Sequence, residues 1–385
     1  MIKNIVTYLK KGGFLFLILC VSLILNHRMN YITIIGVFTI LVLGTITLKT
    51  KIDKGMLIII AYSVLYICIS SLNGFSYSVS TLVLYAVAPF IFYQFGLHLV
   101  ECFKNDNHIM IAWFIIVLCY CLDVFSVTYR DFIETGMLIN PKREFVFSDD
   151  VSSYQLSATL VGLPMDIGMI GLPMFVLVKN NCLRLGFLLL FISSLLTTFS
   201  LLNRTGIAVA LLCFTIVIGY RSRNNLKMLM SSLFGVGVVI GLLIYLGLIN
   251  TELMEFYSER NEDLSTMGTR TERWTTALGY LFTCPFGWAS NGQTYYVHNM
   301  WLDVARISGI IPFILLAYIA YDSFRKAFSL VRKYESSLAY MILGLNVCFF
   351  ASCFVEPIYG GTHMMLYCML WGTSTKLLTN NSIQR

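Results

Sequence analysis

Long apolar segments alternate with short polar ones along almost the whole chain. A membrane-spanning helix needs roughly 20 mostly apolar residues, and twelve segments approach this length. The first is followed by a polar stretch rather than by a small-residue cleavage site, so we expect it to remain as a membrane helix. The pattern predicts an all-α polytopic membrane protein in which residues 1–385 form a single integral membrane domain. The twelve predicted helices cover Gly13–Asn26, Tyr31–Leu48, Met56–Leu72, Ser78–Leu97, Ile109–Val127, Leu156–Val178, Leu185–Leu201, Gly206–Tyr220, Met228–Ile249, Met300–Tyr321, Leu338–Val355 and Tyr359–Leu377.

The composition supports this prediction. Hydrophobic residues make up 57% of the chain, charged residues make up 12%, and the mean hydropathy is +0.76, whereas a soluble domain carries roughly 25% charged residues. The net charge of +7 could suggest a nucleic-acid partner, but Lys and Arg cluster in short loops that alternate along the chain. With the N-terminus inside, about two thirds of them lie on the cytoplasmic side, in agreement with the positive-inside rule. We therefore expect both termini in the cytoplasm and no nucleic-acid partner.

Two predicted outer loops hold most of the remaining charged residues. They lie near residues 128–154 and 251–297, and the longer one connects the ninth and tenth predicted helices. The eleven cysteines lie mostly in apolar segments, and only Cys284 falls in an outer loop, so no outer disulfide pair is predicted. The function is therefore expected on the outer face of the membrane.

Asp166 lies in the middle of a predicted membrane helix, between Pro164 and Pro173. A charged residue in hydrocarbon is either functional or paired by default. A broken helix with a carboxylate at mid-membrane is typical of an ion-coupled transporter. Alternatively, a kinked helix could turn Asp166 towards a Ser, Asn or Arg side chain of a neighbouring helix. The sequence leaves both interpretations open.

Two outer segments combine arginine with a helix-start signal. Asn203 is a good N-cap, which would place Arg204 in the first turn of the following helix. The pattern Thr269-x-x-Glu272 has the form of a capping box, so a helix should begin at Arg270, with Arg273 on the same face. Two cations at a helix N-terminus oppose the macrodipole, and a bound anion would reverse this unfavourable term. Both segments could therefore bind a phosphate group, although a solvated surface helix would also carry such arginines.

A third segment precedes the tenth predicted membrane helix. Asn299 can cap that helix, His298 stands just before it, and Asp303 and Arg306 are spaced to form an ion pair within it. The planar guanidinium group of arginine matches the oxygens of phosphate. An enzyme that uses a polyprenyl-diphosphate substrate needs such groups at the level of the lipid headgroups, which is where the predicted topology puts them.

These segments resemble the motifs of the O-antigen polymerase (Wzy-type) and O-antigen ligase superfamily. Asn203-Arg204-Thr205-Gly206 is similar to the family's S/N-R-T-G turn, and Arg270-x-x-x-Trp274 to its R-x-x-x-W motif. Pro285-x-Gly287, His298-Asn299-x-x-Leu302 and Gly309 follow in the family's order. The Gly-x-Gly part of the second turn is degraded here, and only Arg270 has the family's spacing to a tryptophan, so the role of Arg273 relative to Arg270 stays open.

The resemblance implies a C-type glycosyltransferase that joins lipid-linked glycans without a metal or cofactor. An acceptor hydroxyl would attack the anomeric carbon of a glycan on undecaprenyl diphosphate, and arginines would neutralise the leaving diphosphate. His298 could accept the hydroxyl proton or could orient the loop through a hydrogen bond. The candidate catalytic residues are thus His298, Arg270 and Arg273, and the candidate substrate-binding residues are Arg204, Asn203, Trp274, Asn299 and Asp303.

The family contains two activities that these motifs do not separate. A polymerase extends O-antigen or capsule repeats on the periplasmic face of the inner membrane, where a chain-length regulator could assist it. A ligase transfers the polymer to lipid A-core instead. Two substantial outer loops favour the polymerase. An ion-coupled exporter or flippase, suggested by Asp166, is the alternative from a different functional class.

Overall fold

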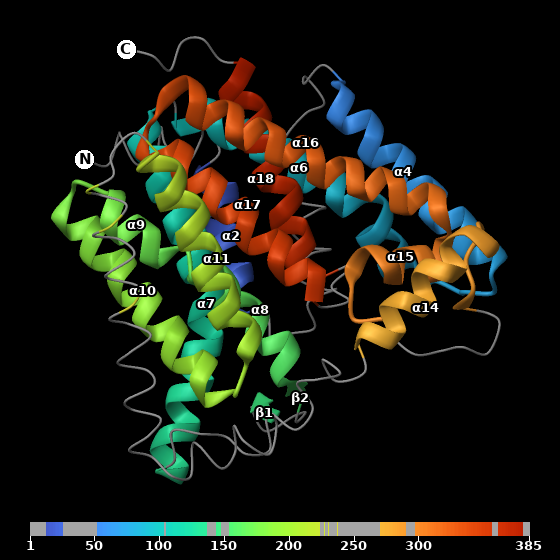
Figure 1. Ribbon diagram of the computed structural model, residues 1–385, viewed down its shortest axis with the longest axis horizontal. Helices are drawn as coiled ribbons and strands as arrows, with labels where there is room; N and C mark the ends of the chain where they lie inside the picture. Colours follow the sequence, from blue (N-terminus) through green and yellow to red (C-terminus); the bar gives the residue numbers. More distant parts are fainter. Residues whose placement is uncertain are drawn as a thin grey trace.

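Within the part of the chain that the structure describes, six helices are long and apolar enough to cross a membrane by length and composition. They belong to a predominantly helical bundle, shown in Figure 1, in a computed structural model that describes residues 13–25, 52–103, 105–136, 144–147, 154–223, 227, 230, 237, 270–289, 297–355 and 361–379. These apolar helices are typical of a membrane-embedded protein, and they are its candidate spanning segments within the described residues. They are Lys54–Leu72 (α4), Val79–Phe103, Asp106–Thr135 (α7), Asn181–Ser200 (α10), Arg204–Arg221 (α11) and Ser337–Phe354, which belongs to α17 (Ser337–Val355).

The span Val79–Phe103 is continuous but changes its hydrogen-bond pattern. It consists of α5 (Val79–Leu82), a π-helical turn η2 (Val83–Val87) and α6 (Ala88–Phe103). The first predicted helix is present as α2 (Phe14–Ile24), and the last as α18 (Thr362–Thr379). The second and ninth predicted helices, Tyr31–Leu48 and Met228–Ile249, lie outside the continuously described ranges.

Two of the predicted membrane helices are each broken into two pieces. The segment predicted as Leu156–Val178 forms α8 (Ala158–Gly168) and α9 (Gly171–Leu177), with Pro164 inside the first piece. The segment predicted as Met300–Tyr321 forms α15 (Met300–Ser308) and the much longer α16 (Ile310–Tyr334). Gly309 separates these two with a φ of 81°, a backbone conformation that glycine adopts without steric cost. The prediction of one straight helix here was wrong because it did not weigh this glycine.

A small β-hairpin accompanies the helices. Strands β1 (Glu144–Phe147) and β2 (Tyr154–Ser157) pair antiparallel, with Glu144 opposite Ser157 and Phe147 opposite Tyr154. Strand β1 falls within the first predicted outer loop, whereas β2 begins at the end of that loop and overlaps the start of the predicted helix Leu156–Val178. Helix α7 also extends to Thr135, eight residues beyond the predicted helix end at Val127. The first outer loop is thus partly structured by regular elements.

The core is formed by close packing of α6 against α18, with α17 beside them. Gly96 of α6 faces the backbone of Met369, and Gly372 of α18 faces the backbone of Tyr93, at distances that leave no room for a Cβ atom. Small residues of this kind let two helix backbones approach closely in a membrane. Trp113, Phe92 and Trp371 are among the large side chains that are fully buried around this contact.

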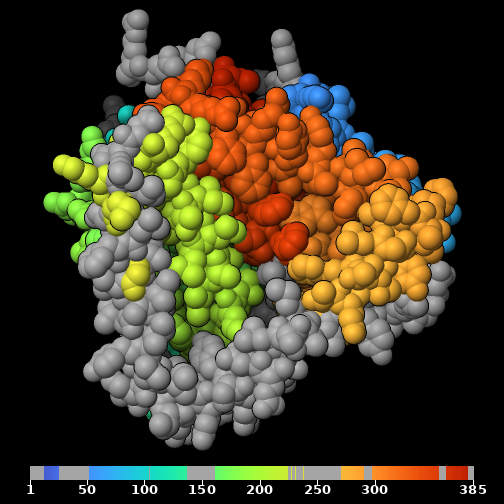
Figure 2. Space-filling model, viewed as in Figure 1, coloured from blue at the N-terminus to red at the C-terminus, as the bar shows by residue number. Residues whose placement is uncertain are grey.

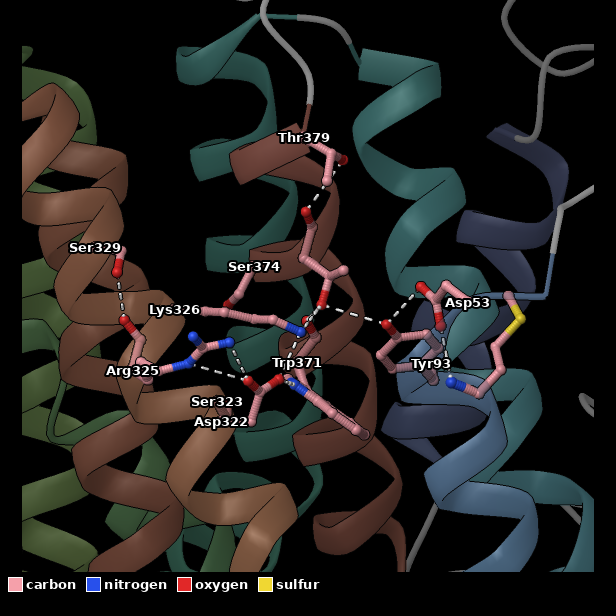
Figure 3. Close-up of polar contacts among 12 residues, drawn as sticks. Asp53, Tyr93, Asp322, Ser323, Arg325, Lys326, Ser329, Trp371, Ser374 and Thr379 are labelled. Atoms are coloured by element: carbon pink, nitrogen blue, oxygen red, sulfur yellow. Dashed lines mark hydrogen bonds and ion pairs between the residues drawn. The ribbon is translucent and has the colours of Figure 1, made fainter.

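A polar network joins α4, α6, α16 and α18 on one side of this core (Figure 3). Asp322 of α16 accepts hydrogen bonds from Trp371 Nε1 at 2.9 Å and from Arg325, and it pairs with Lys326 at 2.6 Å. Lys326 also donates to Thr375 of α18. The Tyr93 hydroxyl donates to Asp53, which caps the N-terminus of α4 through the backbone N–H of Met56. Four helices are thereby fixed by charges and hydrogen bonds that compensate one another.

Candidate active site

The first half of the candidate site is α14, which covers Arg270–Thr283. The described part of the helix starts at Arg270, and Thr269 of the predicted capping box lies outside the described residues. Arg270 and Arg273 are both half-buried in or next to the first turn. Because they are three residues apart, they lie on neighbouring positions of one face. An anion at this helix end would interact favourably with both guanidinium groups and with the helix dipole.

The other face of α14 anchors it to the rest of the protein. Ala277 and Leu281 are buried against Trp288, Leu302 and Ala305 of the segments that follow. Leu278 and Phe282, in contrast, are 50% and 75% exposed. The helix therefore has one apolar stripe packed inward and another facing outward. Figure 2 shows α14 at the edge of the molecule.

Trp274 connects α14 to the histidine segment. Its indole Nε1 donates to the backbone carbonyl of Val297 at 2.9 Å, and its ring packs edge-on against Phe354 of α17, with 5.1 Å between the ring centroids. This places the first turn of α14 directly beside the residue that precedes His298. The tryptophan of the R-x-x-x-W motif thus has a structural role that the sequence alone did not show.

His298 and Asn299 form a sharply bent entry to α15. His298 has a φ of 56°, in the left-handed region that residues other than glycine adopt at a cost of about 1 kcal/mol. The Asn299 side chain accepts from the N–H of Leu302 at 3.1 Å, which confirms the predicted N-cap, and donates to the carbonyl of Phe354 at 3.0 Å. Asn299 therefore ties α15 to the end of α17. Strained backbone of this kind is concentrated at functional sites.

The side chain of Asp303 stabilises this bend. Its carboxylate accepts from the backbone N–H groups of Val297 and Asn299, at 3.0 and 3.4 Å, and pairs with Arg306 at 3.2 Å. The ion pair was predicted from its spacing, but both side chains are more than nine-tenths buried. Burial raises the pKa of the Asp303 carboxyl, and the hydrogen bonds and the Arg306 charge oppose this increase. Asp303 was expected to bind substrate, and the structure instead directs its carboxylate to the backbone on either side of His298.

An apolar pocket of about 500 Å³ opens next to these residues. Trp274 and Asn299 line it where it meets the site, and Trp301, Phe313, Phe324 and Phe354 line the rest. Trp274 directly follows Arg273 in sequence, and Asn299 directly follows His298. The apolar pocket thus lies next to the two segments that carry the arginines and the histidine.

The turn Pro285-x-Gly287 contacts the segment around Gly309 at the C-terminal end of α14. The N–H of Trp288 donates to the carbonyl of Arg306, and the N–H of Ile310 donates to the carbonyl of Pro285, both at 2.9 Å. Gly287 and Gly309 have φ values of 104° and 81°. The structure therefore gives a physical reason for these motif glycines, since each permits a turn in which two backbone segments meet.

Asn203 and Arg204 lie on a different part of the molecule. Asn203 caps α11 through the N–H of Thr205 at 3.0 Å, so Arg204 starts the helix as predicted. α11 packs against α17, α8, α9 and α10, whereas α14 packs against α15. In Figures 1 and 2, α11 and α14 lie on opposite sides of α17. Six of the eight predicted site residues thus share the α14–α15 unit, and the other two lie across α17 from it.

Asp166 is buried beneath the start of α11. It is 1% exposed, and a Cβ atom added to Gly206 would lie 3.2 Å from its Oδ1 and 2.8 Å from the hydroxyl of Thr198. Gly206 is in the first turn of α11, where the positive end of the helix dipole favours a carboxylate. The helix break after Asp166 is present, and its surroundings stabilise a negative charge through α11.

Sequence reasoning missed Asn73, the residue that follows α4. Its side chain reaches the backbone of the α14–α15 unit from a position more than 200 residues earlier in the chain. A polar residue at a helix end is so common that no sequence signal distinguishes this one. Only the tertiary contact of α4 with α15 and α16 identifies it.

The residues that the structure describes also limit which other sites are present. Within these ranges, no three His, Cys, Asp or Glu side chains are grouped so that they could hold a metal ion. No protein-family model matches the chain, and no curated protein matches it either.

Proposed function

We propose that the chain is a glycosyltransferase that polymerises undecaprenyl-diphosphate-linked oligosaccharide repeats of O-antigen or capsule. One observation carries this proposal: Arg270 and Arg273 stand at the start of α14, and the adjacent Trp274 opens onto an apolar pocket of about 500 Å³. A lipid diphosphate combines the two chemistries that this arrangement would accommodate. Its phosphates would bind the arginines, and part of its isoprenoid chain would enter the pocket.

The arginines fit a diphosphate better than a single carboxylate. Each guanidinium group offers a planar fork of donors that matches the oxygens of a phosphate group. The outward face of the same helix carries Leu278 and Phe282, which are largely exposed, as are Ile311 and Ile314 at the start of α16. An apolar surface of this kind along α14 and at the start of α16 suits a ligand that arrives from the lipid phase.

In the proposed reaction, an acceptor hydroxyl attacks the anomeric carbon of the donor glycan. A new C–O bond forms, the bond between that carbon and the diphosphate oxygen breaks, and the leaving lipid diphosphate takes the electron pair. The arginines stabilise the charge that develops on the diphosphate, an electrostatic effect that is commonly worth several kcal/mol. His298 either accepts the hydroxyl proton or orients the segment, and its bent backbone is compatible with both roles.

The finer topology belongs to the same proposal. We expect twelve spanning segments, both termini in the cytoplasm, and the α14–α15 unit on the periplasmic face of the inner membrane. The six apolar helices support a membrane location. The distribution of Lys and Arg along the sequence supports the orientation.

The two alternatives predict different phenotypes and different sensitive residues. Loss of a polymerase leaves a lipid A-core that carries a single repeat, whereas loss of a ligase leaves a bare core and polymer trapped on its lipid carrier. An ion-coupled exporter would depend on Asp166. Because Asp166 faces the positive end of α11, where a cation would be disfavoured, we favour a packing role for it.

The test is to replace arginine by lysine at the start of α14 and follow polymer formation in a deletion strain that makes lipopolysaccharide. Arg270→Lys and Arg273→Lys should lose most activity at normal protein level, since an ammonium group cannot reproduce a two-pronged phosphate contact. The matched control is Arg130→Lys, at a half-exposed position near the end of α7, and it should be nearly silent. Equal losses at all three positions, or complete loss from Asp166→Asn with Arg270→Ala tolerated, would contradict the enzyme assignment.

A further inference from the structure

We infer that Asn73 is a positioning residue for the α14–α15 site, although it lies at the opposite end of α14 from the arginines. The inference rests on the proposed function, because it concerns how the arginines are held for transfer. Asn73 follows the last residue of α4, and its side-chain amide donates to the carbonyl of Phe286 at 2.6 Å and to that of Ile307 at 2.9 Å. A carboxamide nitrogen has two hydrogens, and both are used here.

These two carbonyls belong to different arms of the site. Phe286 lies in the turn after α14, and Ile307 lies in the last turn of α15. One side chain of α4 therefore bridges the ends of both helices and joins them to a membrane-spanning segment. Among the residues described, Asn73 is the side chain that makes hydrogen bonds to both arms at once.

The backbone around Asn73 leaves little freedom at this junction. A Cβ atom on Gly287 would lie 2.9 Å from Asn73 Nδ2 and 2.9 Å from the carbonyl of Arg306, which is tighter than real Cβ contacts. The reciprocal hydrogen bonds of Trp288 and Ile310 close the same junction from both sides. Asn73 thus lies in a closely packed junction between the turn after α14 and the end of α15, and hydrogen bonds fix both of these segments.

Geometry explains why this junction would matter for chemistry at the other end of α14. The helix has 14 residues, so it is about 21 Å long at 1.5 Å per residue. A tilt of about 3° at the junction would move the first turn by about 1 Å, and a displacement of this size in an active site can cost about 100-fold in rate. The hydrogen bond from Trp274 to Val297 restrains the first turn itself, so we expect a partial rather than a complete loss.

Two substitutions at Asn73 test this inference. Asn73→Ala removes both donors, and Asn73→Asp keeps the shape but directs a carboxylate at two carbonyl oxygens. Purified protein in lipid nanodiscs, supplied with lipid-linked repeats, should show a kcat 10- to 100-fold lower in both variants, with Asn73→Asp the more affected. The KM for the donor should change by less than about threefold, because the groups that bind it are present but displaced.

The matched control is Asn180→Ala. Asn180 caps the distant α10 through the N–H of Leu183 at 3.1 Å, and loss of a cap costs typically about 1 kcal/mol. It should lower the melting temperature as much as Asn73→Ala does and leave kcat within twofold of wild type. An equal fall in kcat for Asn180→Ala would mean that general destabilisation explains the effect, and the inference would be overturned.

A second readout is independent of activity. Hydrogen–deuterium exchange of residues 285–310 should be faster in Asn73→Ala than in wild type, most clearly at the amides of Trp288 and Ile310. Unchanged exchange, or faster exchange with wild-type kcat, would reject Asn73 as a positioning residue. Absence of any transfer by the wild-type protein would reject the proposed function instead, and the exchange result would still decide whether Asn73 holds the junction.

Discussion

The pattern Asp-x-x-Arg occurs twice on the consecutive helices α15 and α16, and the two copies behave differently. Asp303 and Arg306 form one pair, and Asp322 and Arg325 form the other, with nitrogen–oxygen distances of 3.2 and 2.7 Å. Both aspartates are almost fully buried. Burial raises the pKa of Asp303, with its hydrogen bonds only partly opposing that increase. Burial alone would also raise the pKa of Asp322, but its donors outweigh burial and the net pKa is lowered.

The difference comes from the partners that other helices provide. Asp322 has a second cation, Lys326, and a hydrogen bond from Trp371 of α18, and Arg325 is 59% exposed and therefore remains hydrated. Asp303 has a single cation that is itself 7% exposed, and its other donors are backbone N–H groups. A buried ion pair recovers its desolvation cost only when enough further hydrogen bonds are present. The Asp322–Arg325 pair thus stabilises the bundle. The Asp303–Arg306 pair, in contrast, keeps a buried charge with a high desolvation cost next to the candidate site.

The largest expected effect follows from removing one partner of the buried pair. Arg306→Met should lower the free energy of unfolding by about 3–5 kcal/mol, because Asp303 would remain as an uncompensated buried charge. The measurement is the thermal melting of detergent-purified protein. The double variant Asp303→Asn, Arg306→Met should recover most of this loss. If the double variant is as unstable as the single one, the charge of Asp303 is not the cause.

An intermediate effect should appear as opposite pH dependences of the two aspartates. The folded-state pKa of Asp303 is raised, so acidification towards the unfolded value of about 3.9 protonates the folded state first and stabilises wild type relative to Asp303→Asn. The pKa of Asp322 is lowered, so its contribution is present above about pH 3.9 and is lost as the pH falls through the folded-state pKa.

Melting curves of wild type, Asp303→Asn and Asp322→Asn between pH 7 and pH 3.5 measure this difference. The advantage of wild type should grow on acidification in the first comparison and shrink in the second. Two differences that change in the same direction would show that the two Asp-x-x-Arg units are equivalent after all.

The smallest effect is expected for Arg325→Ala. Exposed ion pairs contribute less than about 1 kcal/mol, and Lys326 and Trp371 would still satisfy Asp322. The melting temperature should therefore change by only a few degrees, in contrast to Arg306→Met. A loss as large as that of Arg306→Met would mean that exposure does not distinguish the two pairs.

Much of the fold follows from the hydrophobic pattern. Of the twelve predicted helices, those near Met56–Leu72, Ser78–Leu97, Leu185–Leu201 and Leu338–Val355 are found with boundaries shifted by a few residues. The break at Gly309 was not predicted, because apolar length alone does not distinguish one helix from two that are joined by a turn. The prolines around Asp166, in contrast, had indicated a broken or kinked helix, and a break follows Gly168. The β-hairpin was also missed, since its first strand lies in a segment expected to be an outer loop and its second overlaps the start of a predicted helix.

The short-range hydrogen bonds and the ion pair of the site were also predictable from the sequence. The caps at Asn203 and Asn299 and the Asp303–Arg306 pair all depend on contacts within four residues, and each is present. The inward direction of the Asp303 carboxylate and the position of Arg204 across α17 could not be predicted. They depend on how helices far apart in sequence pack against one another.

The amino-acid sequence by itself determined the membrane character, most helix positions and the caps, because hydropathy and hydrogen bonds between near neighbours act along the chain. Only the tertiary structure decided that Asn73 of α4 bonds to both arms of the α14–α15 unit, and that Trp274 and Asn299 share one apolar pocket. The same packing gave two identical Asp-x-x-Arg patterns opposite pKa shifts. The physical reason is that burial and the number of donors around a charge are set by side chains from other helices, whose approach no local pattern encodes.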